Sequence, residues 1–274
     1  MDLESNGTSF ARLGQIIMKP IYIFNCDHVR PGDVVLDLGC GGANQLCMLA
    51  QMHPSSEFIG LELSDAMIEF AREQVLERKL KNVKIMKGDM SKIYESGLFE
   101  RNSVDVMVST CTLHHLSDEC HLELTFKEIC KVLKKDGCLY LYDLLHVKSN
   151  DTIPLLSSLH DEDQDEQYKL DYENSMRAAF HKDSILKVVE QTLQLEYGNV
   201  SIHTTFGINF MFCIKRERSN KDDINSIENT EEKIKHLKEC LERFKNELKD
   251  PSYHKSLKAL KTLFRLNGLK SNYL

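Results

Sequence analysis

The chain has 274 residues, of which 42% are hydrophobic and 28% charged, as expected for one large folded domain with an appendage. No apolar run approaches the roughly 20 residues of a membrane span, and the N-terminus lacks the features of a secretory signal, so we expect a cytoplasmic protein. The last 60 residues carry 15 Lys and Arg against 10 Asp and Glu, a net charge of +5. Because the whole chain has a net charge of −7, residues 1–214 have a net charge of −12. An acidic body argues against non-specific nucleic-acid binding.

Short apolar runs alternate with amphipathic segments from residue 34 onward. A helical segment over residues 1–33, interrupted at Pro20, is expected before them. The predicted strands span residues 34–38, 58–63, 83–88, 104–110 and 138–145. The predicted helices between them span residues 44–52, 64–80 and 118–133. Because the strands are nearly all apolar, as strands covered on both faces require, this order predicts a doubly wound α/β sheet.

The chain beyond the fifth strand departs from this alternation. Residues 146–181 contain an acidic run and are expected to form an insertion that covers the substrate, before a helix over 182–193. The runs 200–206 and 208–216 predict two further strands at an antiparallel edge of the sheet. Residues 219–274 predict a basic helical hairpin with an apolar seam, which would pack on the body, on a second copy in a homodimer, or on a protein partner.

A glycine-rich turn follows the first predicted strand, in the run VVLDLGCGGAN over residues 34–44. Glycines allow a ligand to approach the backbone, and the helix N-terminus behind them offers free amides. A dinucleotide fingerprint would have glycine where Asn44 stands, and the lysine of a phosphate-binding loop is absent. Asp37, two residues before the first glycine, suits a ligand with a positive charge and amine donors.

Two more acids follow the next two strands. Glu62 ends the second predicted strand, where a carboxylate can accept hydrogen bonds from both ribose hydroxyls. Asp89 ends the third strand, where it can accept a hydrogen bond from an adenine amino group. Adenine, ribose and a cationic amino acid together describe S-adenosylmethionine, which is the cofactor that these acids predict.

Residues 34–143 resemble a class I S-adenosylmethionine-dependent methyltransferase, whose motif acid-x-G-x-G-x-G runs here from Asp37 to Ala43, with alanine in place of the last glycine. The resemblance implies a seven-stranded Rossmann-like methyltransferase domain over residues 34–216. It also implies a set of cofactor-binding residues: Asp37, Gly39, Cys40, Gly41, Glu62, Leu63, Asp89, Met90, Ser109 and Thr110. The stretch STCTLHHLSD, residues 109–118, resembles the small-molecule branch of the family.

Catalytic candidates follow the fourth strand. Methyl transfer requires alignment of the nucleophile with the methyl group and, for some acceptors, removal of a proton. His114 or His115 could act as this general base, because the pKa of histidine is close to neutral. The alternative is that both histidines cap the next helix or pack beneath the cofactor.

Substrate contacts are expected from the insertion and from the end of the fifth strand. The run DYENSMRAAF, residues 171–180, resembles segments of uncharacterised family members. The residues predicted to contact the substrate are His146, Tyr172, Asn174 and Arg177. The alternative is an ordinary helix that docks through Met176, Ala179 and Phe180.

These features predict a methyltransferase that acts on a small metabolite at oxygen, nitrogen or carbon. One alternative is a peptide or protein methyltransferase that recruits its target through residues 219–274, and another is a non-catalytic S-adenosylmethionine-binding protein. Nucleic acid is disfavoured as substrate, since STCT stands where an N/D-P-P-Y/F/W motif would lie. The nine cysteines form no C-x-x-C pair, so they predict reduced thiols and no metal site.

Overall fold

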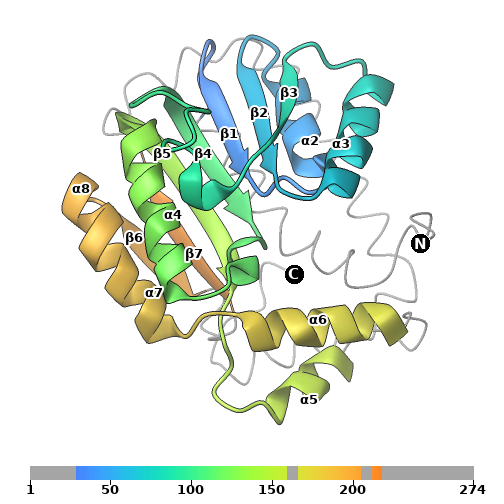
Figure 1. The fold of residues 1–274 in the computed structure, drawn as a ribbon, viewed down its shortest axis with the longest axis vertical. Helices are drawn as coiled ribbons and strands as arrows, with labels where there is room; N and C mark the ends of the chain where they lie inside the picture. Colours follow the sequence, from blue (N-terminus) through green and yellow to red (C-terminus); the bar gives the residue numbers. More distant parts are fainter. Residues whose placement is uncertain (1–28, 159–165, 205–210, 218–274) are drawn as a thin grey trace, which may run out of the picture.

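A seven-stranded sheet forms the centre of the molecule, in the order β3-β2-β1-β4-β5-β7-β6 (Figure 1). It was found in a computed structural model that describes residues 29–158, 166–204 and 211–217. The strands are β1 (Val34–Leu38), β2 (Glu57–Glu62), β3 (Val83–Lys87), β4 (Val104–Thr110), β5 (Leu133–Leu144), β6 (Ser201–Thr204) and β7 (Met211–Arg216). The first five are parallel, and β7 pairs antiparallel with both β5 and β6. The doubly wound sheet and its antiparallel edge are confirmed.

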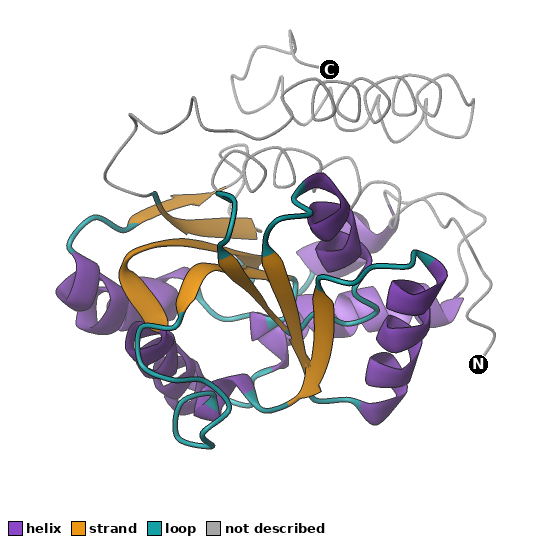
Figure 2. Cartoon of the chain, turned by 90° about the horizontal axis from the view of Figure 1, so that it is seen from above, coloured by secondary structure: helices purple, strands orange, loops and turns teal. Residues whose placement is uncertain are grey.

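Helices lie on both sides of the sheet (Figure 2). They are α2 (Asn44–Met52), α3 (Asp65–Glu77), α4 (Glu119–Val132), α5 (Thr152–Ser158), α6 (Glu166–Ala178), α7 (Lys182–Val189) and α8 (Leu195–Tyr197). Three single turns complete the described elements: the 3₁₀ turns η1 (Met90–Lys92) and η2 (Leu113–His115) and the π turn η3 (Glu190–Gln194). Together with the strands, they place a helix or turn after every parallel strand.

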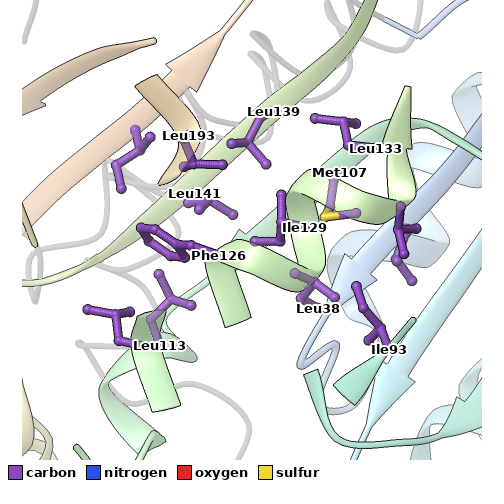
Figure 3. Close-up of a cluster of buried hydrophobic side chains, with 14 of the residues drawn as sticks. Leu38, Ile93, Met107, Leu113, Phe126, Ile129, Leu133, Leu139, Leu141 and Leu193 are labelled. Carbon is purple, nitrogen blue, oxygen red and sulfur yellow. The ribbon is translucent and has the colours of Figure 1, made fainter. Parts of the chain in front are cut away.

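Two apolar clusters fill the space between the sheet and its helices. Strand residues alternate between the faces, so Val35 packs with α2 and α3 while Leu36 and Leu38 pack with α4 and α7. Figure 3 shows this second cluster, in which Phe126 and Ile129 of α4 meet the side chains of β4 and β5. The sheet is thus covered on both faces, which explains why its central strands are nearly continuous apolar runs.

The helix boundaries follow local capping signals. The Ser64 side chain accepts a hydrogen bond from the Met67 amide at 3.5 Å and starts α3, at the position where the helix over residues 64–80 is predicted to begin. Asp118 starts α4 in the same way, through the amide of His121 at 2.9 Å. Gly198, at φ 72°, follows α8 at the end of the run that begins with α7.

Two predicted boundaries were wrong by four residues or more. The fifth strand begins at Leu133, directly after α4, because Leu133 pairs with Val104 ahead of an irregularity in the ladder between β4 and β5. The helix predicted to end at Leu193 continues through η3 and α8 to Tyr197. It ends there because Gly198, the first glycine after the start of α7, adopts the left-handed conformation.

Other predictions fall wholly or mostly outside the described residues. They concern the helical segment over residues 1–33, of which the structure describes 29–33, the connection between β6 and β7, and the hairpin over residues 219–274. Among the described residues, no helix has both the length and the apolar character needed to cross a membrane.

Candidate functional site

The glycine turn after β1 is held tightly at the carboxyl ends of the parallel strands. The amides of Gly39 and Cys40 donate to the Leu61 carbonyl at 2.8 and 3.0 Å, which pins the turn to β2. Gly39 has φ +69°, and a Cβ placed on it would lie 1.9 Å from Cγ2 of Thr112. Only glycine fits this position, because the left-handed conformation and the close side chain both exclude a larger residue.

Glu62 connects the turn to the end of β2. Its Oε2 accepts a hydrogen bond from the Gly41 amide at 2.9 Å, and its Oε1 accepts from the amides of Leu63 and Ser64 at 2.8 and 3.0 Å. The carboxylate is therefore fixed in orientation beside the turn. Leu63, the next residue, is a large apolar side chain that is 63% exposed.

Asp37 lies buried beneath the same turn. Its side chain is 3% exposed, and none of the described residues donates a hydrogen bond to its carboxyl group. Burial, reinforced by the negative charge of Glu62, raises the pKa of Asp37 from 3.8 to about 7. A buried carboxyl group without a cationic partner is costly when ionised, so this position favours a ligand that brings a positive charge.

Asp89 caps the short turn η1 after β3. Its Oδ1 accepts hydrogen bonds from the amide and the hydroxyl of Ser91, at 2.9 and 2.7 Å. Both bonds use the same oxygen, and Met90 follows as the first residue of η1. The acids predicted at the ends of three successive strands thus lie along one edge of the sheet, since β1, β2 and β3 are parallel neighbours.

The two hydroxyl residues at the end of β4 have different surroundings. Ser109 is buried and donates to the Leu38 carbonyl at 2.8 Å, so its hydroxyl is used within the sheet. Thr110 instead donates to Oε1 of Gln45 at 2.9 Å, in the first turn of α2. Of the two, Thr110 is the residue whose hydroxyl reaches the N-terminus of the helix behind the glycine turn.

Asp143, near the end of β5, organises the turn that carries the predicted catalytic histidines. Its Oδ2 accepts hydrogen bonds from the amides of Thr112, at 2.8 Å, and Leu113, at 2.5 Å. Its Oδ1 lies 2.6 Å from Nδ1 of His114 and accepts from the Leu144 amide at the same distance. The carboxylate therefore sets both the backbone of η2 and the orientation of the His114 ring.

The two histidines differ in environment. The ring of His114 is buried against Asp143, whereas His115 is exposed, with the ring centroids 4.2 Å apart. Partial desolvation and, after it, the neighbouring His114 lower the pKa of His115. A buried imidazole held by a carboxylate through Nδ1 presents Nε2 as its proton acceptor, which is the geometry of a general base.

Helix α6 packs against η2 and runs below the carboxyl ends of β4 and β5 (Figure 1). Tyr172 faces inward and is buried, as are Met176 and Ala179, which matches the docking that the sequence offered as an alternative. Asn174 and Arg177 lie on the exposed face, where Arg177 forms an ion pair with Glu173 at 2.7 Å. The substrate contacts predicted for Asn174 and Arg177 stay predictions.

His146 lies where the chain leaves β5. Its amide donates to the Phe180 carbonyl at 2.9 Å, and its ring centroid is 4.2 Å from that of His181. These contacts tie the segment that follows β5 to the end of α6. Residues 146–181 therefore hold α5 and α6 at the carboxyl edge of the sheet, while the covering of a substrate stays a prediction.

Sequence reasoning missed Gln45 and Thr112 as members of the site. Gln45 directly precedes the apolar run LCMLA of α2, and its place in the first turn of the helix behind the glycine turn was the only signal for it. Thr112 offered none, because its role depends on its approach to Gly39. Among the described residues, no group of three or more His, Cys, Asp or Glu side chains could hold a metal ion.

Comparison with known proteins identifies the family. A family model described as a methyltransferase domain matches residues 30–248. The chain belongs to the S-adenosylmethionine-dependent methyltransferase family. The glycine turn, the buried carboxyl group of Asp37 and the fixed carboxylate of Glu62 fit its cofactor, because they offer a close backbone approach beside negative charge.

Curated relatives match the methyltransferase over part of their length. Demethylmenaquinone methyltransferase of Listeria monocytogenes is 27% identical over 147 residues, which are 51% of this chain and 59% of the relative. The tRNA (guanine-N(7)-)-methyltransferase of Clostridium kluyveri is 33% identical over 73 residues, 27% of this chain and 34% of the relative. The chain thus spans less than two thirds of the length of these relatives.

Solved structures share the fold of this methyltransferase. A methyltransferase from Aquifex aeolicus has a TM-score of 0.51 at 18% identity and covers 73% of this chain and 90% of its own. Geranyl diphosphate C-methyltransferase from Streptomyces coelicolor has a TM-score of 0.53 at 14% identity and covers 73% of this chain and 78% of its own. Both support the Rossmann-like arrangement of the sheet.

The raised pKa of Asp37 predicts a pH-dependent effect on stability in the cofactor-free methyltransferase. The folded pKa of about 7 exceeds the unfolded value of 3.8, so the folded state is penalised as pH rises from about 4 to 7. At roughly 1.4 kcal/mol per pKa unit, Asp37→Asn should therefore raise the free energy of unfolding by a few kcal/mol at pH 8. The gain should shrink towards zero near pH 4.

Urea unfolding of both proteins between pH 4 and pH 8 measures this difference. Asp65→Asn serves as the control, because Asp65 is an exposed carboxylate paired with Lys87 at 2.6 Å. The same stability difference at pH 4 and pH 8 would contradict the burial of an ionisable Asp37.

Proposed function

We propose that this chain transfers the methyl group of S-adenosylmethionine to a small-molecule acceptor. The observation that carries the proposal is the buried Asp37 carboxyl group, which lies beside Glu62 and beneath a glycine turn that admits no side chain at Gly39. When bound, the cofactor supplies a methyl group already activated by a sulfonium centre. The residues of the chain therefore need to bind, align and, where the acceptor requires it, remove a proton.

The cofactor contacts divide among the first three strands. Asp37 would receive the ammonium group, and Glu62, fixed by three backbone amides, would accept hydrogen bonds from the ribose hydroxyls. Asp89 would accept from the adenine amino group, with the exposed Leu63 and the neighbouring Met90 against the adenine ring. The backbone of Gly39, Cys40 and Gly41 would line the approach, while Thr110 and Ser109 complete the edge at β4.

The acceptor side would be formed by β4, β5 and α6. His114 is the proposed general base, because Asp143 holds its Nδ1 and thereby leaves Nε2 to accept a proton. Tyr172 is the proposed substrate-contacting residue of α6, since it faces inward where α6 packs on η2. His146 would border the same region from the end of β5.

Two findings support a small acceptor. The relative that matches half of this chain is named for methylation of demethylmenaquinone, a small molecule. The tRNA methyltransferase matches only 73 residues, which is too little of the chain to carry an acceptor assignment. Helices α5 and α6 also lie across the carboxyl edge of the sheet, where an acceptor would enter (Figure 1). The alternative, a peptide acceptor recruited by residues 219–274, depends on a segment outside the described residues.

Cofactor binding tests the first half of the proposal. Isothermal calorimetry should show that the wild-type chain binds S-adenosylhomocysteine and that Gly39→Ala weakens this binding at least about 100-fold, because the added Cβ would collide with Thr112. Gly97→Ala is the matched control: Gly97 also has a positive φ, +74°, but a Cβ there meets nothing within 4 Å. Equal affinity in the two variants would contradict the assignment of the glycine turn.

The size of the acceptor can be tested directly. The chain is incubated with methyl-labelled S-adenosylmethionine and a whole-cell extract, and the products are separated by size. The proposal predicts label in the fraction of small molecules, with none in that fraction for Gly39→Ala. Label confined to proteins or to nucleic acid would overturn the small-molecule assignment while leaving the methyltransferase assignment intact.

The general base is tested by kinetics with a hydroxyl or amine acceptor found in this way. His114→Ala should lower kcat by about 10²- to 10⁴-fold, the range expected for loss of a positioned base. The affinity for S-adenosylhomocysteine should change little, which separates this loss from a collapse of the site. His115→Ala should have the smaller effect, because no carboxylate of the described residues is hydrogen-bonded to that ring. Full kcat in both variants would remove the histidines from the mechanism.

A further inference from the structure

Gln45 carries a buried hydrogen-bond donor that the structure leaves unused. Its Oε1 accepts a hydrogen bond from the Thr110 hydroxyl at 2.9 Å, which fixes the plane of the side-chain amide. Its Nε2 is buried and, among the described side chains, is one of two such atoms without a hydrogen-bond partner. An unsatisfied buried donor is costly, and a native site that retains one is expected to use it for a ligand.

This donor lies on the same side of the sheet as Asp37. Val35 of β1 and Val108 of β4 both pack in the cluster that includes α2, so Asp37 and Thr110, each two residues further on, face the same way. Asp37 is in register with Val108, so Thr110 lies two residues further along the neighbouring strand. The amide of Gln45, bonded to Thr110, and the carboxyl group of Asp37 therefore lie on the same face of the sheet, near the carboxyl ends of β1 and β4.

We infer that Nε2 of Gln45 donates a hydrogen bond to the carboxylate of the cofactor's amino-acid end, while Asp37 receives its ammonium group. This inference rests on the proposed function and deepens it by one contact. A zwitterionic end needs an acceptor and a donor within a few ångströms of each other, and Asp37 alone would repel the carboxylate. Gln45, in the first turn of the nine-residue helix α2, supplies the donor, and the helix N-terminus adds a favourable dipole.

The arrangement makes Gln45 a positioning residue and a source of ligand selectivity. The amide is neutral, so it can satisfy the carboxylate without adding a second charge beside Asp37. Thr110 would act through Gln45, because its hydroxyl holds Oε1 and so directs Nε2. A ligand that lacks the carboxylate would leave Nε2 unpaired, as it is in the cofactor-free chain.

Ligand truncation tests the contact by calorimetry. The probes are S-adenosylhomocysteine and its decarboxylated analogue, S-adenosyl-3-thiopropylamine, which keeps the amine and loses the carboxylate. Gln45→Leu should lower the affinity for S-adenosylhomocysteine by about 10- to 100-fold, the range for a hydrogen bond to a charged group, and should leave the affinity for the analogue within about twofold. Gln51→Leu, an exposed position on the same helix, is the control and should alter neither.

Gln45→Glu decides which end of the amide faces the ligand. The new carboxylate can still accept from Thr110 but would repel the ligand carboxylate, so the loss for S-adenosylhomocysteine should exceed that of Gln45→Leu. An unchanged affinity for S-adenosylhomocysteine in Gln45→Leu, an equal loss for both probes, or a retained affinity in Gln45→Glu would each overturn the inference. If the wild-type chain bound neither probe, the proposed function itself would fail.

Discussion

The structure depends on a concentration of negative charge at the ends of β1 and β2. Asp37 is buried, the charge of Glu62 lies nearby, and the pKa of Asp37 rises to about 7 in consequence. Such a pair is unfavourable for folding, and the chain maintains it by fixing the surroundings. The amides of the glycine turn donate to Leu61 and Glu62, so the turn cannot relax away from the buried acid. Local instability of this kind is typical of a binding site.

A second fixed carboxylate sets the other half of the site. Asp143 gathers backbone amides from the turn after β4 and holds the ring of His114, so the end of β5 determines the shape of the segment after β4. Thr112 then reaches back, donating its hydroxyl hydrogen bond to the Gly39 carbonyl at 3.0 Å. The Thr112 side chain thus connects the region proposed for the acceptor to the glycine turn proposed for the cofactor through a hydrogen bond.

The sequence predicted the sheet and the helices around it because their signals are local. Apolar runs of five to eight residues, a glycine turn and the caps Ser64 and Asp118 determine where these elements begin. It did not predict the start of β5 at Leu133, since that depends on pairing with Val104 on another strand. The same limit applies to the site. The spacing of Asp37, Glu62 and Asp89 along the chain indicates a cofactor, whereas Thr112 and Gln45 matter only through residues that are distant in sequence.

The residues proposed to bind the cofactor and those proposed to face the acceptor lie on different elements of the fold. This separation explains why one fold can support different chemistries. The elements proposed to hold the cofactor are β1 to β3 and their turns. Backbone hydrogen bonds join them, so few substitutions are compatible with their geometry. The elements proposed to face the acceptor are η2, α6 and the segment after β5, which meet through side chains such as Tyr172 and through the bond from His146 to Phe180. Substitutions in α6 are proposed to alter the acceptor without disturbing the glycine turn. We therefore propose that acceptor identity is decided where α6 packs on η2, the turn that follows β4.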